Sequence, residues 1–244
     1  VMKKLYKEDL WNKILEEVEL FSNDKTMKYY FKNNILNFNN LSDALSLLIS
    51  KNLKSQEVHE DNIIHDVGVA FKSKDIIHAI EEDINEIYHK DPACNYFFQP
   101  LLFYKGFQAL QAYRVANYWV EEKLSFSLYI QSVVSEKFNV DIHPNAKMGK
   151  GIMVDHASGV VIGETAIVGD YSSIFHGVTL GGVGSEKGQR HPQVGKNVLL
   201  SANSTIVGNI KIGDNAKIGA GSVVIDDIPK DCTAVGVPAK VINN

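Results

Sequence analysis

Apolar residues follow two different spacings along the chain, and the change from one to the other falls near residue 139. Before that point they recur every three or four positions, which places them on one face of an α-helix. This spacing predicts helices near residues 10–18, 41–49, 73–91, 100–122 and 125–138. Ser73 is a suitable N-cap for the third helix. That helix should end at Asp91-Pro92, because proline disfavours helical backbone in the residue before it.

After Asn139 the apolar residues recur every six positions, in three runs that we call the frame positions. A slip of two residues separates the first run from the second, and the segment GGVGSEKGQRHPQ separates the second from the third. The frame positions are Ile142, Met148, Val154 and Val160; Ile162, Val168, Ile174 and Leu180; and Val194, Leu200, Ile206, Ile212, Ile218 and Val224. A small residue often follows four positions later, as at Ala146, Ser158, Ala166, Ser172, Ser204, Ala216 and Ser222.

A period of six does not match the 3.6 residues of a helical turn. It fits a three-sided prism in which six residues form one short strand and one corner. Three such units close a coil of about 18 residues, and coils stack about 4.8 Å apart. The predicted fold class is therefore α + β. An all-helical domain over 2–139 is followed by a parallel β-helix of hexapeptide repeats over 140–241, with an inserted loop near 181–193.

The composition of the chain argues against several classes of function. The net charge is −4, and acidic and basic residues are mixed along the chain, so neither nucleic acid nor an anionic membrane is the expected partner. The two cysteines, Cys94 and Cys232, imply no disulfide framework. Cys94 has no activating neighbour in the sequence and is expected to be a small buried residue. The N-terminal residues lack a hydrophobic signal core, and we expect a cytoplasmic protein.

Several longer motifs identify a family. They are DPAC at 91–94, PLLFYKGFQALQAYR at 100–114, VDIHPNAKMGKGIMVDHASGVVIGETA at 140–166, VTLGG at 178–182 and RHPQVG at 190–195, followed by AKIGAGSVV and GVPAK. Over roughly 91–241 and in its helical preface, the chain resembles the serine O-acetyltransferases of the hexapeptide-repeat acyltransferase superfamily. The resemblance implies a left-handed β-helix. It also implies transfer of an acetyl group from acetyl-coenzyme A to the hydroxyl of L-serine, giving O-acetyl-L-serine in cysteine biosynthesis.

The resemblance assigns catalytic roles to two residues. His156 matches the family's catalytic histidine, and an imidazole with an ordinary pKa near 6.5 suits a general base. Asp141 matches the carboxylate that orients the ring and stabilises the imidazolium. The two residues are 15 positions apart, close to the length of one coil, so they are expected on adjacent coils. We therefore expect direct transfer without an acyl-enzyme.

Substrate and cofactor residues also follow from the resemblance. It implies that Asp91 and Asp155 bind the ammonium group of serine. It also implies that Arg190 and His191 bind the serine carboxylate, since an arginine can hold a carboxylate through two parallel hydrogen bonds. Coenzyme A is expected along the later coils, where small residues allow close approach and lysines meet phosphates. The candidates are Ala202, Lys217, Ala220 and Lys240.

The resemblance further implies partners. Family members are usually trimers with coenzyme A between neighbouring prisms, and two trimers join through their helical domains into a hexamer. L-cysteine is an expected feedback inhibitor because it is close in shape to serine. Docking to O-acetylserine sulfhydrylase is expected only if a C-terminal tail extends beyond Asn244, since the family uses such a tail. No metal is expected.

Three other functions remain open at this point. A hexapeptide acetyltransferase could use another acceptor, such as homoserine, a sugar or an antibiotic, although the paired acidic and basic candidates favour an amino acid. A zinc lyase of the carbonic anhydrase type is built on the same prism. His156 and His176 each follow a frame position by two residues and could stack in one column, but zinc needs a third ligand, and His143 and His191 do not obviously share that column. A non-catalytic scaffold would be excluded by measurable acetyl transfer.

Overall fold

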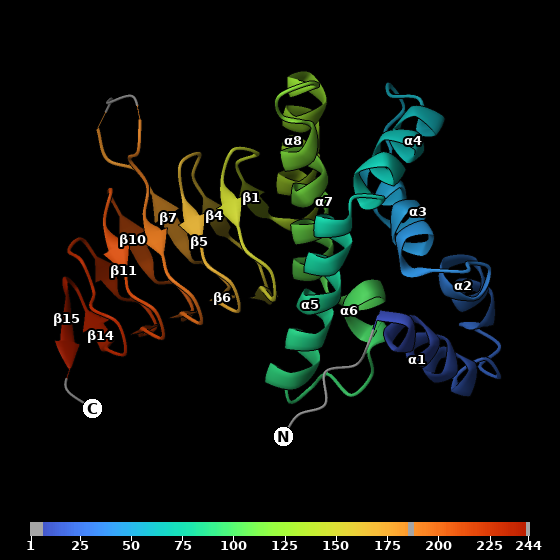
Figure 1. The fold of residues 1–244 in the computed structure, drawn as a ribbon, viewed down its shortest axis with the longest axis horizontal. Helices are drawn as coiled ribbons and strands as arrows, with labels where there is room; N and C mark the ends of the chain where they lie inside the picture. The colour runs from blue at the N-terminus through green and yellow to red at the C-terminus, as the bar shows by residue number, and fades with distance from the viewer. Residues whose placement is uncertain (1–6, 185–187, 243–244) are drawn as a thin grey trace. The chain divides into compact units, whose positions relative to one another are not determined.

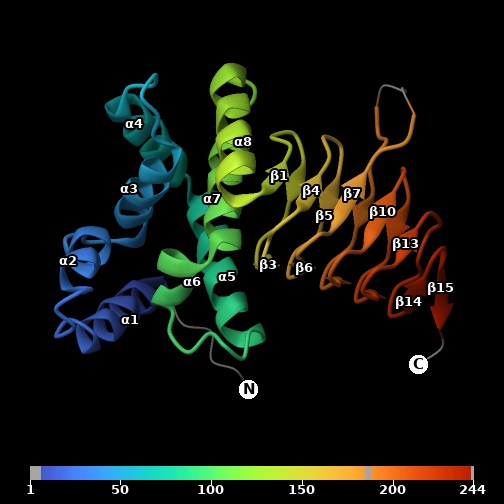
Figure 2. The same ribbon diagram turned by 180° about the vertical axis from the view of Figure 1, so that it is seen from behind.

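A computed structural model describes residues 7–184 and 188–242. The chain divides into two compact units, Val1–Tyr104 and Lys105–Asn244 (Figures 1 and 2). Residues 185–187 of the predicted loop lie outside the described residues. In the described part of the chain, no helix is long and apolar enough to cross a membrane.

The described part of the first unit is helical. Its elements are α1 (Lys7–Leu20), α2 (Lys28–Phe31), the π-helix η1 (Lys32–Leu36), α3 (Leu41–Leu53), α4 (Glu60–Phe71), α5 (Lys74–Lys90) and α6 (Phe98–Phe103). The predicted helices at 10–18, 41–49 and 73–91 are confirmed. Helix α5 begins after Ser73, whose side chain makes no capping bond, and ends at Asp91, whose backbone is extended. Helix α4 was not predicted, although Ile63, Val67 and Ala70 give it a buried face.

The second unit begins with two more helices, α7 (Lys105–Trp119) and α8 (Leu124–Phe138). The helical stretch predicted over 100–122 is present as two helices, because Tyr104 has extended backbone and separates α6 from α7. Helix α7 packs against α8 and against the first strands. At Gly106 a Cβ atom would overlap the backbone carbonyl of Val154, so glycine is needed for this close approach of helix and strand.

Short strands then form three parallel sheets, one on each side of a left-handed β-helix. Sheet A is β1-β4-β7-β10-β13, sheet B is β11-β8-β5-β2, and sheet C is β15-β14-β12-β9-β6-β3. The strands are β1 (Val140–Ile142), β2 (Lys147–Met148), β3 (Met153–Asp155), β4 (Val160–Ile162), β5 (Ile167–Val168), β6 (Ser173–Phe175), β7 (Thr179–Gly181), β8 (Gln193–Val194), β9 (Leu199–Leu200), β10 (Thr205–Val207), β11 (Lys211–Ile212), β12 (Lys217–Ile218), β13 (Val223–Val224), β14 (Thr233–Gly236) and β15 (Ala239–Ile242). Strand β15 pairs antiparallel with β14 and closes the last coil.

The frame positions fill the interior of the prism, as predicted. All of them are buried except Met148, which is half-buried. Frame residues of successive coils pair in register, for example Ile174 with Val154 on one side and Leu200 on the other. The fold class predicted from the hexads is thereby confirmed.

The two-residue slip is a wide corner between sheets C and A. From Ile142 to its register partner Ile162 the coil takes 20 residues, whereas the next takes 18, from Ile162 to Leu180. The extra residues lie in the corner 156–159, which joins β3 to β4. The buried small residue of this corner is Ala157, whereas Ser158, which follows the frame position Val154 by four residues, is exposed. The widened corner displaces the six-residue pattern by two positions.

The helices end at Phe138 and the strands begin at Val140, with Asn139 between them in the left-handed conformation (φ 56°). The compact units divide instead between Tyr104 and Lys105, so α7 and α8 group with the prism. The predicted domain boundary at 139–140 coincides with the change of secondary structure, and its functional meaning stays a prediction.

Candidate active site

His156 projects from the wide corner between β3 and β4. Its side chain is 75% exposed, and its Nε2 atom lies 3.9 Å from Oδ2 of Asp155. His156 and Ala157 both have left-handed backbone, at φ 54° and 60°, which is uncommon for residues other than glycine. Such strain persists where surrounding contacts hold it. One of these contacts is the Lys105 ammonium, which donates to the hydroxyl of Ser158 at 2.5 Å.

A column of residues runs down the same edge of the prism from His156. Each member follows a frame position by two residues: His156, His176, Ala202 and Ala220. The strands before them pair in sequence in sheet C. The rings of His156 and His176 meet edge to face with centroids 6.0 Å apart. The predicted stacking of these two histidines is confirmed, and the side chains shrink to alanine further along the edge.

The column does not supply a metal site. Within residues 7–184 and 188–242, no group of three His, Cys, Asp or Glu side chains is placed to hold a metal ion. His143 follows β1 and His191 precedes β8, so both lie at the corner between sheets A and B. They are thus at a different edge from His156 and His176.

The two lysine candidates for cofactor binding lie in sheet C, beside this column. Lys217 on β12 and Lys240 on β15 are both exposed. Lys217 pairs in register with Leu199 of β9 and Thr233 of β14, and Lys240 pairs with Val235 of β14. All four cofactor candidates therefore lie on one sheet or on the edge that also carries His156.

Asp141 lies on β1 and points out of the prism, because its neighbours Val140 and Ile142 are buried. Its register partner is Val161 on β4, the strand that follows the wide corner. Within the described chain, no hydrogen bond or ion pair joins Asp141 to His156. Instead, Oδ1 of Asp141 accepts a hydrogen bond of 2.7 Å from Nε2 of Gln131 on α8. Gln131 was not among the predicted site residues.

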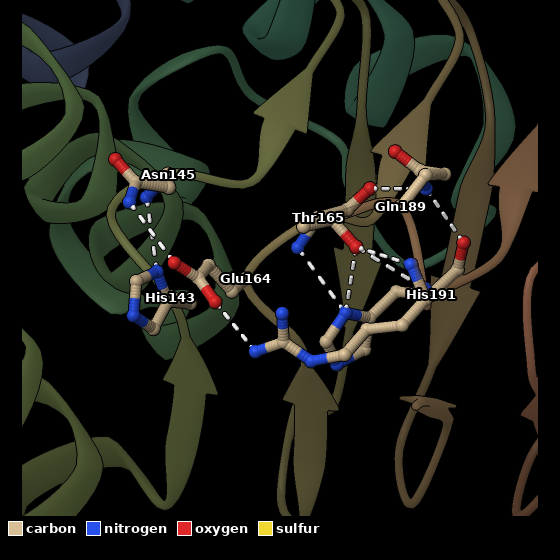
Figure 3. Close-up of polar contacts among 7 residues, drawn as sticks. His143, Asn145, Glu164, Thr165, Gln189 and His191 are labelled. Carbon is tan, nitrogen blue, oxygen red and sulfur yellow. Dashed lines mark hydrogen bonds and ion pairs between the residues drawn. The ribbon is translucent and has the colours of Figure 1, made fainter. Parts of the chain in front are cut away.

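His191 lies at the corner between sheets A and B, after the inserted loop (Figure 3), and Arg190 directly precedes it in the chain. Arg190 donates from Nη2 to Oε2 of Glu164 at 2.5 Å. The Glu164 carboxylate has a lowered pKa, chiefly through this hydrogen bond. A guanidinium carries five N–H donors, so further donors exist for a ligand carboxylate. Glu164 lies in the VIGETA motif, but nothing in its spacing predicts this pair.

Thr165 holds the two predicted residues together. Its hydroxyl oxygen accepts from the backbone N–H groups of Arg190 at 3.0 Å and His191 at 3.1 Å. It also lies 2.9 Å from Nδ1 of His191. Gln189 donates to the carbonyl oxygens of Thr165 and His191 (Figure 3). Sequence reasoning missed Thr165, because its partners come from the far end of the inserted loop.

His191 is buried, and its environment determines the protonation state and tautomer of its imidazole ring. Burial and then the nearby Arg190 charge lower the pKa of its imidazole, which favours the neutral ring. Its Nδ1 accepts from the backbone N–H of Thr165 at 3.2 Å, so the proton of the neutral ring is on Nε2. Nε2 faces Gly163, where a Cβ atom would overlap the ring. The neutral ring therefore carries one donor, at Nε2.

Asp91 belongs to the first unit, where it ends α5. Its Oδ1 accepts from the backbone N–H of Ala93 at 2.8 Å. Burial, and after it the nearby Cys94 and Asp91, raises the pKa of the Tyr104 hydroxyl. Nearby Cys94 is buried, as predicted. Burial raises the pKa of the Cys94 thiol to about 11, so it is not a reactive thiolate near neutral pH.

Comparison with known proteins identifies relatives of the chain. The model for the N-terminal region of serine acetyltransferases matches residues 10–112, and the model for bacterial transferase hexapeptide repeats matches residues 191–226. The serine acetyltransferase of Haemophilus influenzae is 42% identical over 238 residues, which are 96% of this chain and 89% of the relative.

Solved structures match over nearly the whole chain. A serine acetyltransferase of Neisseria gonorrhoeae in complex with serine has a TM-score of 0.93 at 40% identity, covering 99% of this chain and all of that one. One of Brucella abortus in complex with coenzyme A has a TM-score of 0.93 at 39% identity, covering 96% and 95%. A serine acetyltransferase in complex with cysteine has a TM-score of 0.95 at 41% identity, covering 98% and 94%.

Proposed function

The chain belongs to the serine acetyltransferase family, and from this premise we propose how its residues carry out the reaction. It is an acyltransferase that moves the acetyl group of acetyl-coenzyme A to the hydroxyl of L-serine. The products are O-acetyl-L-serine and coenzyme A. Acetyl-coenzyme A is a co-substrate, in keeping with the coenzyme A complex of the Brucella relative.

His156 is the general base in this proposal. The observation that carries it is the 3.9 Å separation between His156 Nε2 and Asp155 Oδ2 at an exposed corner. The ammonium and hydroxyl groups of serine are on neighbouring carbons. A serine whose ammonium binds Asp155 therefore presents its hydroxyl to Nε2 of His156. Asp91 is the second proposed partner of the ammonium.

The transfer proceeds in one displacement through a tetrahedral intermediate. Nε2 of His156 takes the hydroxyl proton as the serine oxygen bonds to the thioester carbonyl carbon. The carbon–sulfur bond then breaks, and the imidazolium returns the proton to the departing thiolate. With Nε2 facing the substrate, Nδ1 is left for Asp141, which stabilises the imidazolium as it forms. The raised thiol pKa supports a reaction without Cys94 as nucleophile.

The cofactor lies along the column of small residues in this proposal. Ala202 and Ala220 leave room at the edge that leads to His156, and successive coils are about 4.8 Å apart. Lys217 and Lys240 are the candidates for binding phosphate groups. An extended coenzyme arm along this edge delivers its thioester at the His156 corner.

The serine carboxylate binds Arg190 and His191, and we propose that they come from a second copy of the chain. The support is topological: His156 lies at the corner of sheets C and A, whereas Arg190 and His191 lie at the corner of sheets A and B. In a cyclic trimer of prisms, the corner of sheets C and A of one chain faces the corner of sheets A and B of its neighbour. A hexamer of two trimers through the helical domains is the larger assembly expected.

Cysteine is the proposed feedback inhibitor. It differs from serine by sulfur in place of the hydroxyl oxygen, so the groups that bind the serine ammonium and carboxylate also suit cysteine. A structural relative binds cysteine. A cytoplasmic location agrees with the two free cysteines. Docking to O-acetylserine sulfhydrylase stays a prediction that depends on a tail beyond Asn244.

Thiol release from acetyl-coenzyme A tests the chemistry. We expect release with L-serine, much less with L-homoserine, and a loss of roughly a hundredfold or more in His156→Ala. Release from the variant equal to that of the parent chain would remove His156 from its role.

Complementation tests the shared site. Co-expression of His156→Ala and Arg190→Ala chains should restore activity that neither variant has alone, because mixed trimers contain some sites with both residues intact. Mixed oligomers without restored activity would place both residues in a site made by one chain.

A further inference from the structure

The proposed reaction assigns no role to the contact between Gln131 and Asp141. This contact lies in a groove of about 440 Å³ between α8 and β1, lined by Leu128, Gln131, Ser132, Ser135, Glu136 and Asp141. Gln131 and Asp141 are both half-buried, and their atoms Nε2 and Oδ1 are 2.7 Å apart. This distance is typical of a hydrogen bond to an ionised acceptor.

Two rigid elements fix the position of Gln131. Its neighbour Ile130 and Val134 are buried in the face of α8, which packs against α7. Helix α8 ends at Phe138, and the N–H of the next residue, Asn139, donates to the carbonyl of Ser135. Strand β1 begins directly after it, at Val140. The turn between helix and strand therefore has little freedom, and Gln131 reaches Asp141 from ten residues away.

In the Gln131–Asp141 pair, the amide is the donor and the carboxylate is the acceptor. An ionised carboxylate only accepts hydrogen bonds, so the amide must present its NH₂ group to Asp141. This donor occupies one oxygen and holds the carboxylate in one orientation. The second oxygen, Oδ2, is then left for another donor.

We propose that Gln131 is a positioning residue for acetyl transfer, which holds Asp141 so that its carboxylate orients the His156 ring. The proposal rests on the roles proposed above for Asp141 and His156. Gln131 itself touches no substrate atom in this scheme, and it acts through Asp141 alone. Its loss should therefore lower kcat and leave the KM values for serine and acetyl-coenzyme A nearly unchanged.

Two substitutions of similar size separate this role from a structural one. Gln131→Leu removes the donor, and Gln131→Glu replaces it with a second carboxylate beside Asp141. Two carboxylates in contact share a proton at lower pH and repel each other once both are ionised. A protonated Glu at position 131 can donate to Asp141 as the amide does, whereas an ionised one cannot.

The measurement is kcat and both KM values between about pH 6 and 9. We expect Gln131→Leu to lower kcat by roughly tenfold to a hundredfold at every pH, since it loses a hydrogen bond to a charged group. For Gln131→Glu, the ratio of its kcat to that of the parent chain should fall as the pH rises. Equal, pH-independent losses in both variants, or losses through KM alone, would overturn the proposal.

Control substitutions distinguish the effect of the Gln131–Asp141 hydrogen bond from a general effect of altering the groove. Glu136 is the other ionisable residue that lines the groove, so Glu136→Gln should leave the pH dependence of Gln131→Glu in place. Ser132→Ala alters the same groove and should keep the parent kcat. Thermal unfolding of every variant identifies any that fold poorly.

Asp141→Asn and His156→Ala in the same assay distinguish this proposal from the function on which it rests. If both of these lose activity while Gln131→Leu and Gln131→Glu match the parent chain, only the role of Gln131 fails. If Asp141→Asn or His156→Ala keeps full activity, the proposed catalytic roles fail first. In a double variant, Gln131→Leu should add little to the loss in Asp141→Asn, because both act on the same ring.

Discussion

The hydroxyl of Thr165 offers a sharp test of how Arg190 and His191, the proposed binding residues for the serine carboxylate, are held in place. Thr165→Val keeps the shape of the side chain and removes an oxygen that accepts two backbone N–H bonds and contacts the His191 ring. An unpaired donor costs about 1–3 kcal/mol when it is buried, and less when water can replace the partner. The N–H of the buried His191 would bear the full cost of losing its acceptor, and the N–H of the half-exposed Arg190 would bear part of it. The local loss is then about 2–4 kcal/mol.

We expect this loss to appear in serine recognition. About 1.4 kcal/mol corresponds to a tenfold change, so the upper bound on the loss in kcat/KM for serine is several hundredfold. Some of the loss will go into rearrangement of the loop, and we expect about tenfold to a hundredfold, carried by KM for serine. The KM for acetyl-coenzyme A should change by less than about twofold, because its candidate residues are at another edge of the prism.

Steady-state kinetics with Thr165→Ser as the matched control check this reasoning. Serine keeps the hydroxyl and loses only the methyl group, so this variant should stay within about threefold of the parent chain. If Thr165→Val bound serine as well as Thr165→Ser, the hydroxyl would not be what holds Arg190 and His191. Equal losses in both variants would point to packing of the methyl group.

Three further predictions concern other parts of the molecule. Cys94→Ala should keep kcat within about twofold in the thiol-release assay, because burial raises the thiol pKa to about 11 and the proposed transfer does not use this thiol. Gly106→Ala should lower the free energy of unfolding by about 1–3 kcal/mol in denaturant titrations, because its Cβ overlaps a β3 carbonyl, whereas Gly68→Ala meets only an atom 3.9 Å away and should not destabilise. His191 has a lowered pKa, so its contribution to stability is present above about pH 6.5 and is lost as the pH falls through the folded pKa. Unfolding of His191→Gln between pH 7.5 and 5 should thus show a smaller loss of stability with acid than the parent chain, and an equal loss would contradict this assignment.

Much of the fold could be predicted because the interior of the prism has a simple rule. Each frame residue must fill one position in a coil, and a period of six is visible in a single sequence. The break at Tyr104 could not be seen in this way, because the apolar spacing continues through it and only the backbone of one residue changes. Helix α4 lacks a capping side chain at His59, so its start has no strong local signal.

In the candidate site, contacts between successive coils could be predicted from the sequence, whereas contacts made across a loop or from a helix could not. The stacking of His156 and His176 follows from counting residues within coils, and the structure confirms it. The contacts of Thr165 and Gln131 could not be counted, since the first crosses an inserted loop and the second joins a helix to a strand. The resemblance to a family named the residues expected to carry function, but not the residues that hold them.

The wide corner at 156–159 has a consequence for how such a protein can change over evolution. Ile142 pairs with Ile162 across 20 residues, and Leu180 pairs with Ile206 across 26, yet both pairs keep the same register as the coils of 18. Residues added at a corner are therefore absorbed outside the ladder and leave the neighbouring coils undisturbed. Insertion and deletion at the edges can alter substrate chemistry while the interior pattern is inherited intact.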